Sequence, residues 1–232
     1  MSKMKWDEIG KRTFETGVSK GVLALMDDAG AYPTAVPWSG LTKVSESPSG
    51  AEETKLYADN IKYLSLVSAE DYAATIECLM YPPEFEACDG CASVAKGITV
   101  GQQDRAKFAF SYQTKKGNDV STDHGYYIYI IYCAQAKPSN KDHETVNESP
   151  AAATMSYEIT TTPVEVNVEG IKPTACLKID STLVDATELA AFEKILYGDT
   201  DTEPKIPLPE EVLTTFAKSV EALKGTQSVS DI

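Results

Sequence analysis

One stretch near the middle of the chain is apolar on both of its alternating faces, and it limits the fold more than any other. It reads Tyr126-Tyr127-Ile128-Tyr129-Ile130-Ile131-Tyr132-Cys133. Such a density of aromatic and β-branched residues is typical of a strand, and a strand without a polar face has to be covered twice. Its own core covers one face, while a helix, a second sheet or another subunit must cover the other. The same aromatic ladder would also suit a stacking platform for sugars or bases, although core or interface is the commoner use.

Further strands make the expected fold mainly β. Residues 107–113 alternate between aromatic residues and small or polar ones, which predicts a half-solvated strand. Residues 115–123 form its polar hairpin loop. Residues 155–162 and 164–169 alternate again and predict late strands of the same sheet system.

Residues 54–80 predict three antiparallel strands joined by tight turns at 58–60 and 68–71. Asp and Asn tolerate the positive φ that such turns require, and the flanking residues suit a pleated surface. A helix is expected to begin at Pro82-Pro83-Glu84-Phe85. The following residues, 90–103, are small and polar and predict an irregular crossover.

The N-terminal part is less regular. Residues 1–13 predict an arm that needs a neighbour to order it, and residues 14–26 predict two short strands. Residues 27–50 are rich in Pro, Gly and Ser around a possible strand at 41–44. A connection of this length is either disordered or works at a surface.

The C-terminal part is helical. Asp185-Ala186-Thr187-Glu188 is a capping box that begins a helix with Leu189, Phe192 and Leu196 on one face, and Gly198 ends it. Pro209 begins a second amphipathic helix. We therefore expect a mainly β (α+β) chain with a β domain over 1–178, a helical segment over 179–224 and a disordered tail over 225–232.

Charge and composition exclude several classes of function. The 35 acidic and 21 basic side chains give a net charge of -14, which argues against tight binding of nucleic acid because that binding depends on Lys and Arg. No run of about 18 apolar residues and no secretory leader is present, so the sequence predicts neither a membrane span nor secretion.

The sequence predicts no enzyme and no catalytic, cofactor-binding or metal site. Cys88 and Cys91 have redox-motif spacing, but no second pair completes a metal site, and a helix end followed by a turn explains them. Residues 17–21 match G-x-S-x-G without the strand and helix that a nucleophile elbow needs. His124 and His143 are isolated loop residues.

The order and spacing of several segments resemble the major tail proteins of bacteriophages with long, non-contractile tails. The resemblance covers about residues 14–198 and rests on no single motif. The segments that carry it are Thr16–Val22, Leu56–Tyr63, Ala74–Glu77, Pro82–Phe85, Phe108–Phe110, Cys133–Pro138, Met155–Tyr157 and Ile179–Thr182 with the capped helix that follows.

This resemblance implies a tail-tube fold of sandwich-like or barrel-forming sheets with a flanking helix. It implies homohexameric rings that stack into a conduit for DNA in the virion tail, made in the host bacterial cytoplasm. The implied partners are the chain itself, the tape measure protein, the tail terminator and the baseplate or tail-tip proteins, with residues 27–50 as a loop between subunits. Two alternatives stay open: a ring-forming tube protein of a bacterial injection apparatus, and a β-sandwich carbohydrate-binding module that uses the Tyr126–Tyr132 ladder.

Overall fold

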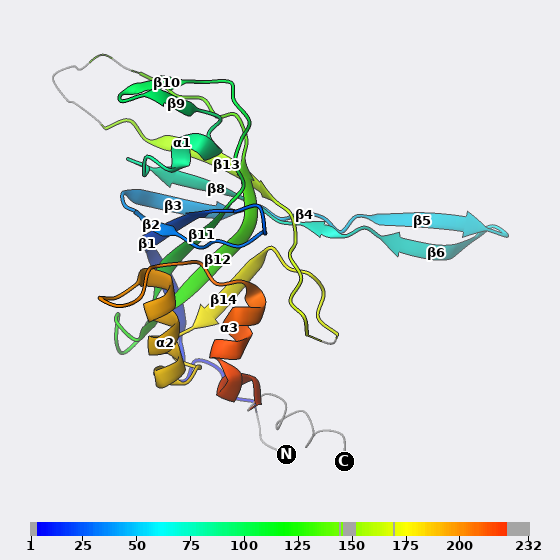
Figure 1. Cartoon of the computed structure of the whole chain (residues 1–232). Helices are drawn as coiled ribbons and strands as arrows, with labels where there is room; N and C mark the ends of the chain where they lie inside the picture. Colours follow the sequence, from blue (N-terminus) through cyan, green and yellow to red (C-terminus); the bar gives the residue numbers. More distant parts are fainter. Residues whose placement is uncertain (1–3, 144, 146–151, 169, 222–232) are drawn as a thin grey trace.

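The computed structural model describes residues 4–143, 145, 152–168 and 170–221, and these are organised around one eight-stranded antiparallel sheet (Figure 1). Seven strands follow in the order β2-β1-β11-β12-β13-β8-β3, and β14 pairs with β12. The strands are β1 (Thr13–Leu25), β2 (Ala35–Trp38), β3 (Leu41–Glu46), β8 (Ala73–Cys78), β11 (Phe108–Asn118), β12 (Gly125–Ala136), β13 (Met155–Thr161) and β14 (Cys176–Asp180). The mainly β class predicted from the sequence is confirmed.

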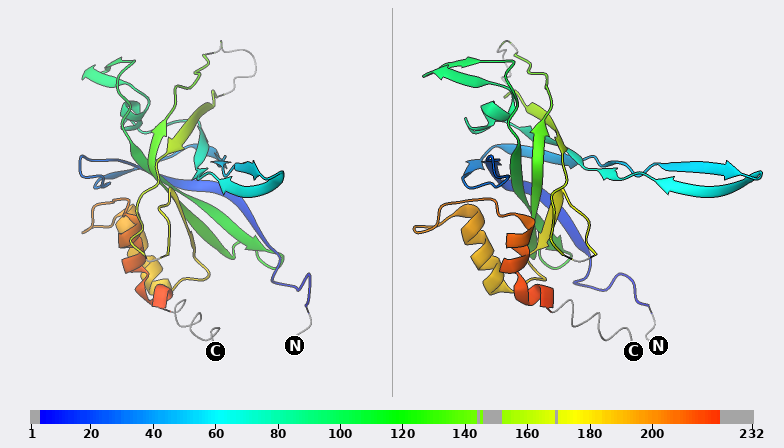
Figure 2. Two further views of the ribbon diagram at one scale, coloured as in Figure 1. Left: turned by 90° about the vertical axis from the view of Figure 1, so that its right-hand side faces the viewer. Right: turned by 45° about the vertical axis from the view of Figure 1, so that its right-hand side comes forward.

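The sheet curls until its two ends approach each other (Figure 2). β1, which lies next to one edge, contacts the opposite edge strand β3. A Cβ added to Gly21 would lie only 2.7 Å from Leu41 Cδ1, so the absence of a side chain permits this close approach. The inner face of the curl encloses a core rich in aromatic residues.

A single helical turn, α1 (Phe85–Cys88), closes one end of this curl. The Phe85 ring is fully buried, with its centroid 4.5 Å from that of Trp38 and 4.8 Å from that of Tyr157. The helix predicted at Pro82 therefore exists, but it spans one turn. The crossover predicted over 90–103 contains a small hairpin of β9 (Ala92–Ala95) and β10 (Ile98–Val100).

The outer face of the sheet is covered by two helices of the same chain, α2 (Ala186–Tyr197) and α3 (Pro209–Thr215) (Figure 1). Phe192 and Phe216 pack together at a centroid distance of 5.4 Å and share a second core with Ile128 and Ile130 of β12. The hydroxyl of Tyr132, also on this face, donates a hydrogen bond to the Pro207 carbonyl at 2.9 Å. Of the three covers that the sequence left open for the second face of this strand, the structure has helices of the same chain, so the strand needs no neighbouring subunit.

The prediction that β11 is half-solvated is wrong, because the same helices cover its outer face. Its second face was expected to be solvated, yet Ala109 is fully buried in the core beneath the helices and Ser111 is buried as well.

β12 changes partners along its length. It pairs with β14 at Tyr127–Ile131 and with β13 at Ala134–Ala136. Cys133, with a φ of 45°, marks the change.

The N-terminal half departs from expectation in two places. Residues 13–25 form one long strand with two irregularities in its pairing, where two short strands were predicted. The strand predicted at 41–44 is present as the edge strand β3, but the same Pro-rich connection over 27–50 also holds the other edge strand, β2, and the two-residue strand β4 (Ser49–Gly50), which were not predicted. Pro37 fits in β2 because an edge strand has one side free of ladder hydrogen bonds. A role for 27–50 between subunits stays a prediction.

The stretch over 54–80 also differs from the predicted three-stranded unit. β5 (Glu53–Ala58) and β6 (Ile61–Val67) pair only with each other, while β8 joins the main sheet between β13 and β3. A short ladder of β4 with β7 (Glu70–Asp71) connects the β5–β6 hairpin to the sheet.

Residues 164–169 form no strand within the described residues, only an isolated bridge between Val164 and Thr174. The tail predicted to be disordered, 225–232, lies outside the described residues. No helix in the described part of the chain is long and apolar enough to cross a membrane.

Candidate assembly surface

The β5–β6 hairpin extends away from the sheet, and among the described residues its two strands contact mainly each other (Figures 1 and 2). Every residue of both strands is exposed. Asp59 and Asn60 form the turn with φ of 51° and 63°, the left-handed conformation predicted for this turn. The hairpin is therefore a two-stranded ribbon with both faces in solvent.

One face of this ribbon is apolar, and we call it the leucine face. Leu56 lies directly opposite Leu64, and Thr54 lies opposite Leu66 two residues further along on the same side. The three leucines are 45%, 46% and 51% exposed. Tyr57, Ile61, Tyr63 and Val67 of the same hairpin are exposed to a still greater extent.

The other face of the ribbon is mixed, with the exposed Val67 opposite Glu53 and Tyr57 two residues after Lys55, and it carries a polar network around one carboxylate. Glu53 accepts hydrogen bonds from Lys62 and Ser65, and the Lys55 ammonium lies 3.4 Å from it. The hydrogen bond from Lys62, followed by that from Ser65, keeps the pKa of the Glu53 carboxyl below its ordinary value. This network joins the two strands on the face opposite the leucine face.

An isolated two-stranded hairpin is marginally stable in water, and monomeric proteins seldom expose large contiguous apolar patches. Strands that are apolar and exposed on this scale are liable to pair with or pack against other chains. The uncovered leucine face is therefore a candidate surface for contact with another molecule.

The N-terminal arm offers a second exposed apolar segment. Met4, Trp6 and Ile9 are 76%, 76% and 82% exposed. The arm is attached at its far end, where the Gly10 amide donates to Asp119 and the Asn118 side chain donates to the Gly10 carbonyl. The predicted need of this arm for a neighbour is consistent with this exposure.

The inner face of the sheet, at the end away from α1, carries paired charges. Lys116 Nζ lies 2.6 Å from Asp180 Oδ2, and both side chains are largely buried. Burial opposes ionisation of Asp180, but its hydrogen bonds from Lys116 and Thr182 outweigh burial and lower its pKa. The bond to Asp180 in turn raises the pKa of Lys116. Close by, Glu15 accepts a hydrogen bond from Tyr129 at 2.9 Å.

The remaining motifs noted in the sequence do not converge on a site. Cys88 ends α1 and is buried, which raises the pKa of its thiol to about 12 and disfavours the reactive thiolate. Gly17–Gly21 lies inside β1, with no helix after the serine. His124 and His143 are exposed, and the described part of the chain holds no group of three or more potential metal ligands.

The aromatic ladder of β12 offers no open stacking platform. Tyr129 is 8% exposed and Tyr132 is fully buried. Tyr127 is half-buried beneath Lys178, whose Nζ lies 3.7 Å from the ring centroid. This arrangement removes the basis for the carbohydrate-binding alternative.

The sequence matches no protein-family model, and no curated protein matches it either. Among solved structures, the chain is similar to a component of the anti-feeding prophage baseplate, with 8% identity over 77% of this chain and 97% of that chain and a TM-score of 0.33. It is also similar to a component of the cap that terminates the anti-feeding prophage tube, with 10% identity over 78% of this chain and 96% of that one and a TM-score of 0.33.

A third similar structure comes from the sheath-tube complex of the PVC extracellular contractile injection system, in its extended state. The identity is 12% over 69% of this chain and 88% of that chain, with a TM-score of 0.28. Because identities and scores are this low, no conclusion about function rests on these similarities.

Proposed function

We propose that this chain is a structural, self-assembling subunit of a phage tail tube, in which homohexameric rings stack to form the conduit through which DNA passes. The observation that carries the proposal is the uncovered leucine face of the β5–β6 hairpin. The sequence resemblance to major tail proteins over about residues 14–198 supports it independently.

A second copy of the chain is the partner that the hairpin fits best. A hairpin that projects from one side of a subunit makes a heterologous contact, in which the donor and acceptor surfaces differ. Heterologous contacts close into rings when the rotation permits, and otherwise they continue as filaments. A stack of rings needs one contact that closes the ring and one that joins successive rings. The β5–β6 hairpin and the N-terminal arm are two of the exposed apolar segments among the described residues.

The charge of the chain suits a conduit. Each contact between a phosphate and a Lys or Arg would retard the passage of a duplex, and a net charge of -14 disfavours such contacts. In this role the chain is no enzyme, it resides in the virion tail, and its further partners are the tape measure protein, the tail terminator and the baseplate or tail-tip proteins.

The test is the assembly of purified protein, measured by sedimentation and negative-stain microscopy over a range of concentrations. We expect hexamers or tubes from the native chain and monomers from a Leu56→Ser, Leu64→Ser, Leu66→Ser triple variant. The matched control replaces Lys55 and Lys62 with Gln on the opposite face of the same hairpin, and should assemble. A native chain that stays monomeric at high concentration, or a triple variant that forms normal tubes, would contradict the proposal.

A further inference from the structure

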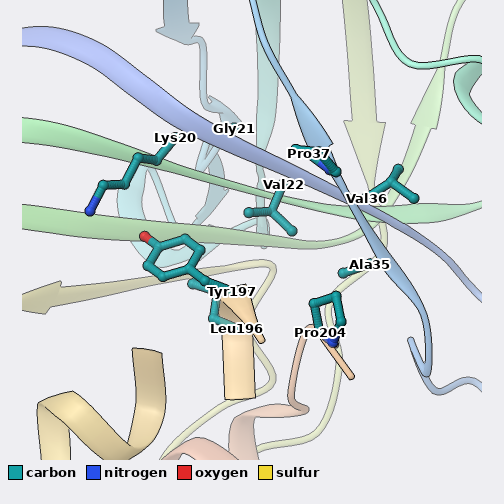
Figure 3. A pocket seen from close by; sticks show the side chains of 9 residues that line it. All are labelled: Lys20, Gly21, Val22, Ala35, Val36, Pro37, Leu196, Tyr197 and Pro204. Atoms are coloured by element: carbon teal, nitrogen blue, oxygen red, sulfur yellow. The ribbon is translucent and has the colours of Figure 1, made fainter. Parts of the chain in front are cut away.

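A hollow of about 260 Å³ opens beside the edge strand β2, where the C-terminal end of α2 meets β1 (Figure 3). Its walls are mostly apolar. They include Val22 of β1, Pro37 of β2, Leu196 and Tyr197 of α2, and Pro204 after the helix, with Lys20 at the rim.

Two polar groups at this hollow, the exposed Lys20 ammonium and the Tyr197 hydroxyl, have no ion-pair or hydrogen-bond partner among the described residues. Lys20 Nζ lies over two aromatic rings, 5.2 Å from the centroid of Tyr197 and 5.8 Å from that of Tyr126, and no carboxylate of the described residues lies within ion-pair distance. The Tyr197 hydroxyl is buried without a hydrogen-bond partner in the described structure. The hollow therefore suits an occupant with an apolar body, a carboxylate and a further hydrogen-bonding group.

The tip of the β5–β6 hairpin has these features. Tyr57 and Ile61, which are 69% and 62% exposed, flank the Asp59-Asn60 turn. Asp59 forms no ion pair with any described residue, and the Asn60 amide both donates and accepts hydrogen bonds. The exposed N-terminal arm fits less well, because its acidic residues Asp7 and Glu8 already lie near Arg12 and Lys11.

The hairpin cannot reach the hollow of its own chain. It extends from the side of the sheet opposite β2 and α2 (Figures 1 and 2). Any contact between the tip and the hollow must therefore join two copies head to tail, which is the heterologous geometry that rings and stacks require.

We propose that the hollow beside β2 receives the β5–β6 tip of a second copy, with Asp59 pairing with Lys20 and the Tyr57 ring packing against the apolar walls. This inference rests on the proposed self-assembly and names the acceptor surface for it.

The test exchanges the two charges. Lys20→Glu leaves the hairpin intact and reverses the acceptor, whereas Asp59→Lys leaves the acceptor intact and reverses the tip. Each variant alone places like charges together, and we expect the concentration needed for assembly to rise by about tenfold or more. An equimolar mixture of the two variants restores opposite charges at every contact and should assemble near the native concentration.

Controls at exposed positions away from the hollow and the tip, Lys96→Glu in the β9–β10 turn and Asp123→Lys in the loop before β12, should assemble normally. Circular dichroism should report a folded state for all variants. Failure of the native chain to assemble would refute the proposed function and this inference with it. Native assembly with unimpaired single variants would overturn this inference alone. So would impaired variants whose mixture does not recover, or a loss confined to Lys20→Glu, which would assign the hollow to another segment.

Discussion

Two pairs of apolar antiparallel strands in this chain have opposite surroundings. β11 and β12 lie at the centre of the sheet, with an aromatic core on one face and α2 and α3 on the other. β5 and β6 carry a comparable pattern of leucine, tyrosine and isoleucine, yet every residue of both strands is exposed. The difference shows that apolar alternation defines a strand that has to be covered, but does not define which molecule covers it.

The two pairs also differ in what holds them. The centre relies on buried ring contacts, such as Phe192 against Phe216. The hairpin relies on exposed ion pairs around Glu53, and exposed pairs contribute little to stability because water screens them. The hairpin can therefore change its surroundings on assembly at small cost to the fold, whereas the centre cannot.

The largest expected effect on stability comes from removing a helix side chain that packs against β12. Phe192→Ala removes a fully buried ring between α2 and the sheet, and we expect a loss of about 3–5 kcal/mol in the free energy of unfolding, measured with denaturant. Phe14→Ala, at a ring that is 43% exposed, is the control for loss of an aromatic residue and should cost far less. A small loss for Phe192→Ala would mean that the helices do not cover the strand in solution.

A smaller effect is expected from Tyr132→Phe. The substitution keeps the ring and removes the hydroxyl, leaving the buried Pro207 carbonyl without its donor at a cost of about 1–3 kcal/mol. Thermal unfolding measures the loss. Tyr63→Phe on the exposed hairpin is the matched control, and an equal effect at both sites would break the contrast between the two strand pairs.

The two helices that cover β12, α2 and α3, were each predicted from the sequence. Asp185 caps α2 by accepting from the amides of Thr187 and Glu188, and Gly198 ends it with a φ of 74°, because these signals depend on neighbouring residues alone. Glu188 was expected to complete the capping box, but its carboxylate accepts from Lys218 and Ser219 instead. These contacts join residues 30 and 31 positions apart in the sequence, a separation that local spacing does not encode.

The candidate site was predicted only in part for the same reason. The turn at Asp59-Asn60 was evident from its residues, but the departure of the hairpin from the sheet was not, since β5, β6 and β8 share one alternation. The edge strand β2 was missed because Pro37 argues against a strand until its edge position is known. The hollow beside β2 depends on segments far apart in the sequence and left no local signal.

Acidification should reveal the contribution of the largely buried pair of Asp180 and Lys116 to stability. Asp180 has a lowered pKa in the folded chain, so its contribution to stability is present above its ordinary pKa of 3.8 and is lost as the pH falls through the lower folded value. Asp180→Asn should therefore flatten the loss of stability on acidification below about pH 4, measured by denaturant unfolding at a series of pH values. An unchanged acid profile would contradict the pairing with Lys116.

The smallest expected effect on stability belongs to the leucine face, and it is the sharpest test of the comparison. Leu66→Ser replaces a side chain that is already 51% exposed, so the free energy of unfolding of the monomer should change by less than about 0.5 kcal/mol. Ile130→Ser, which buries a hydroxyl between β12 and the helices, is the counterpart at the centre and should be severely destabilising. If Leu66→Ser were as costly as Ile130→Ser, the leucine face would already be covered within the monomer. It would then have no reason to seek a second copy, because the same apolar surface cannot be buried twice.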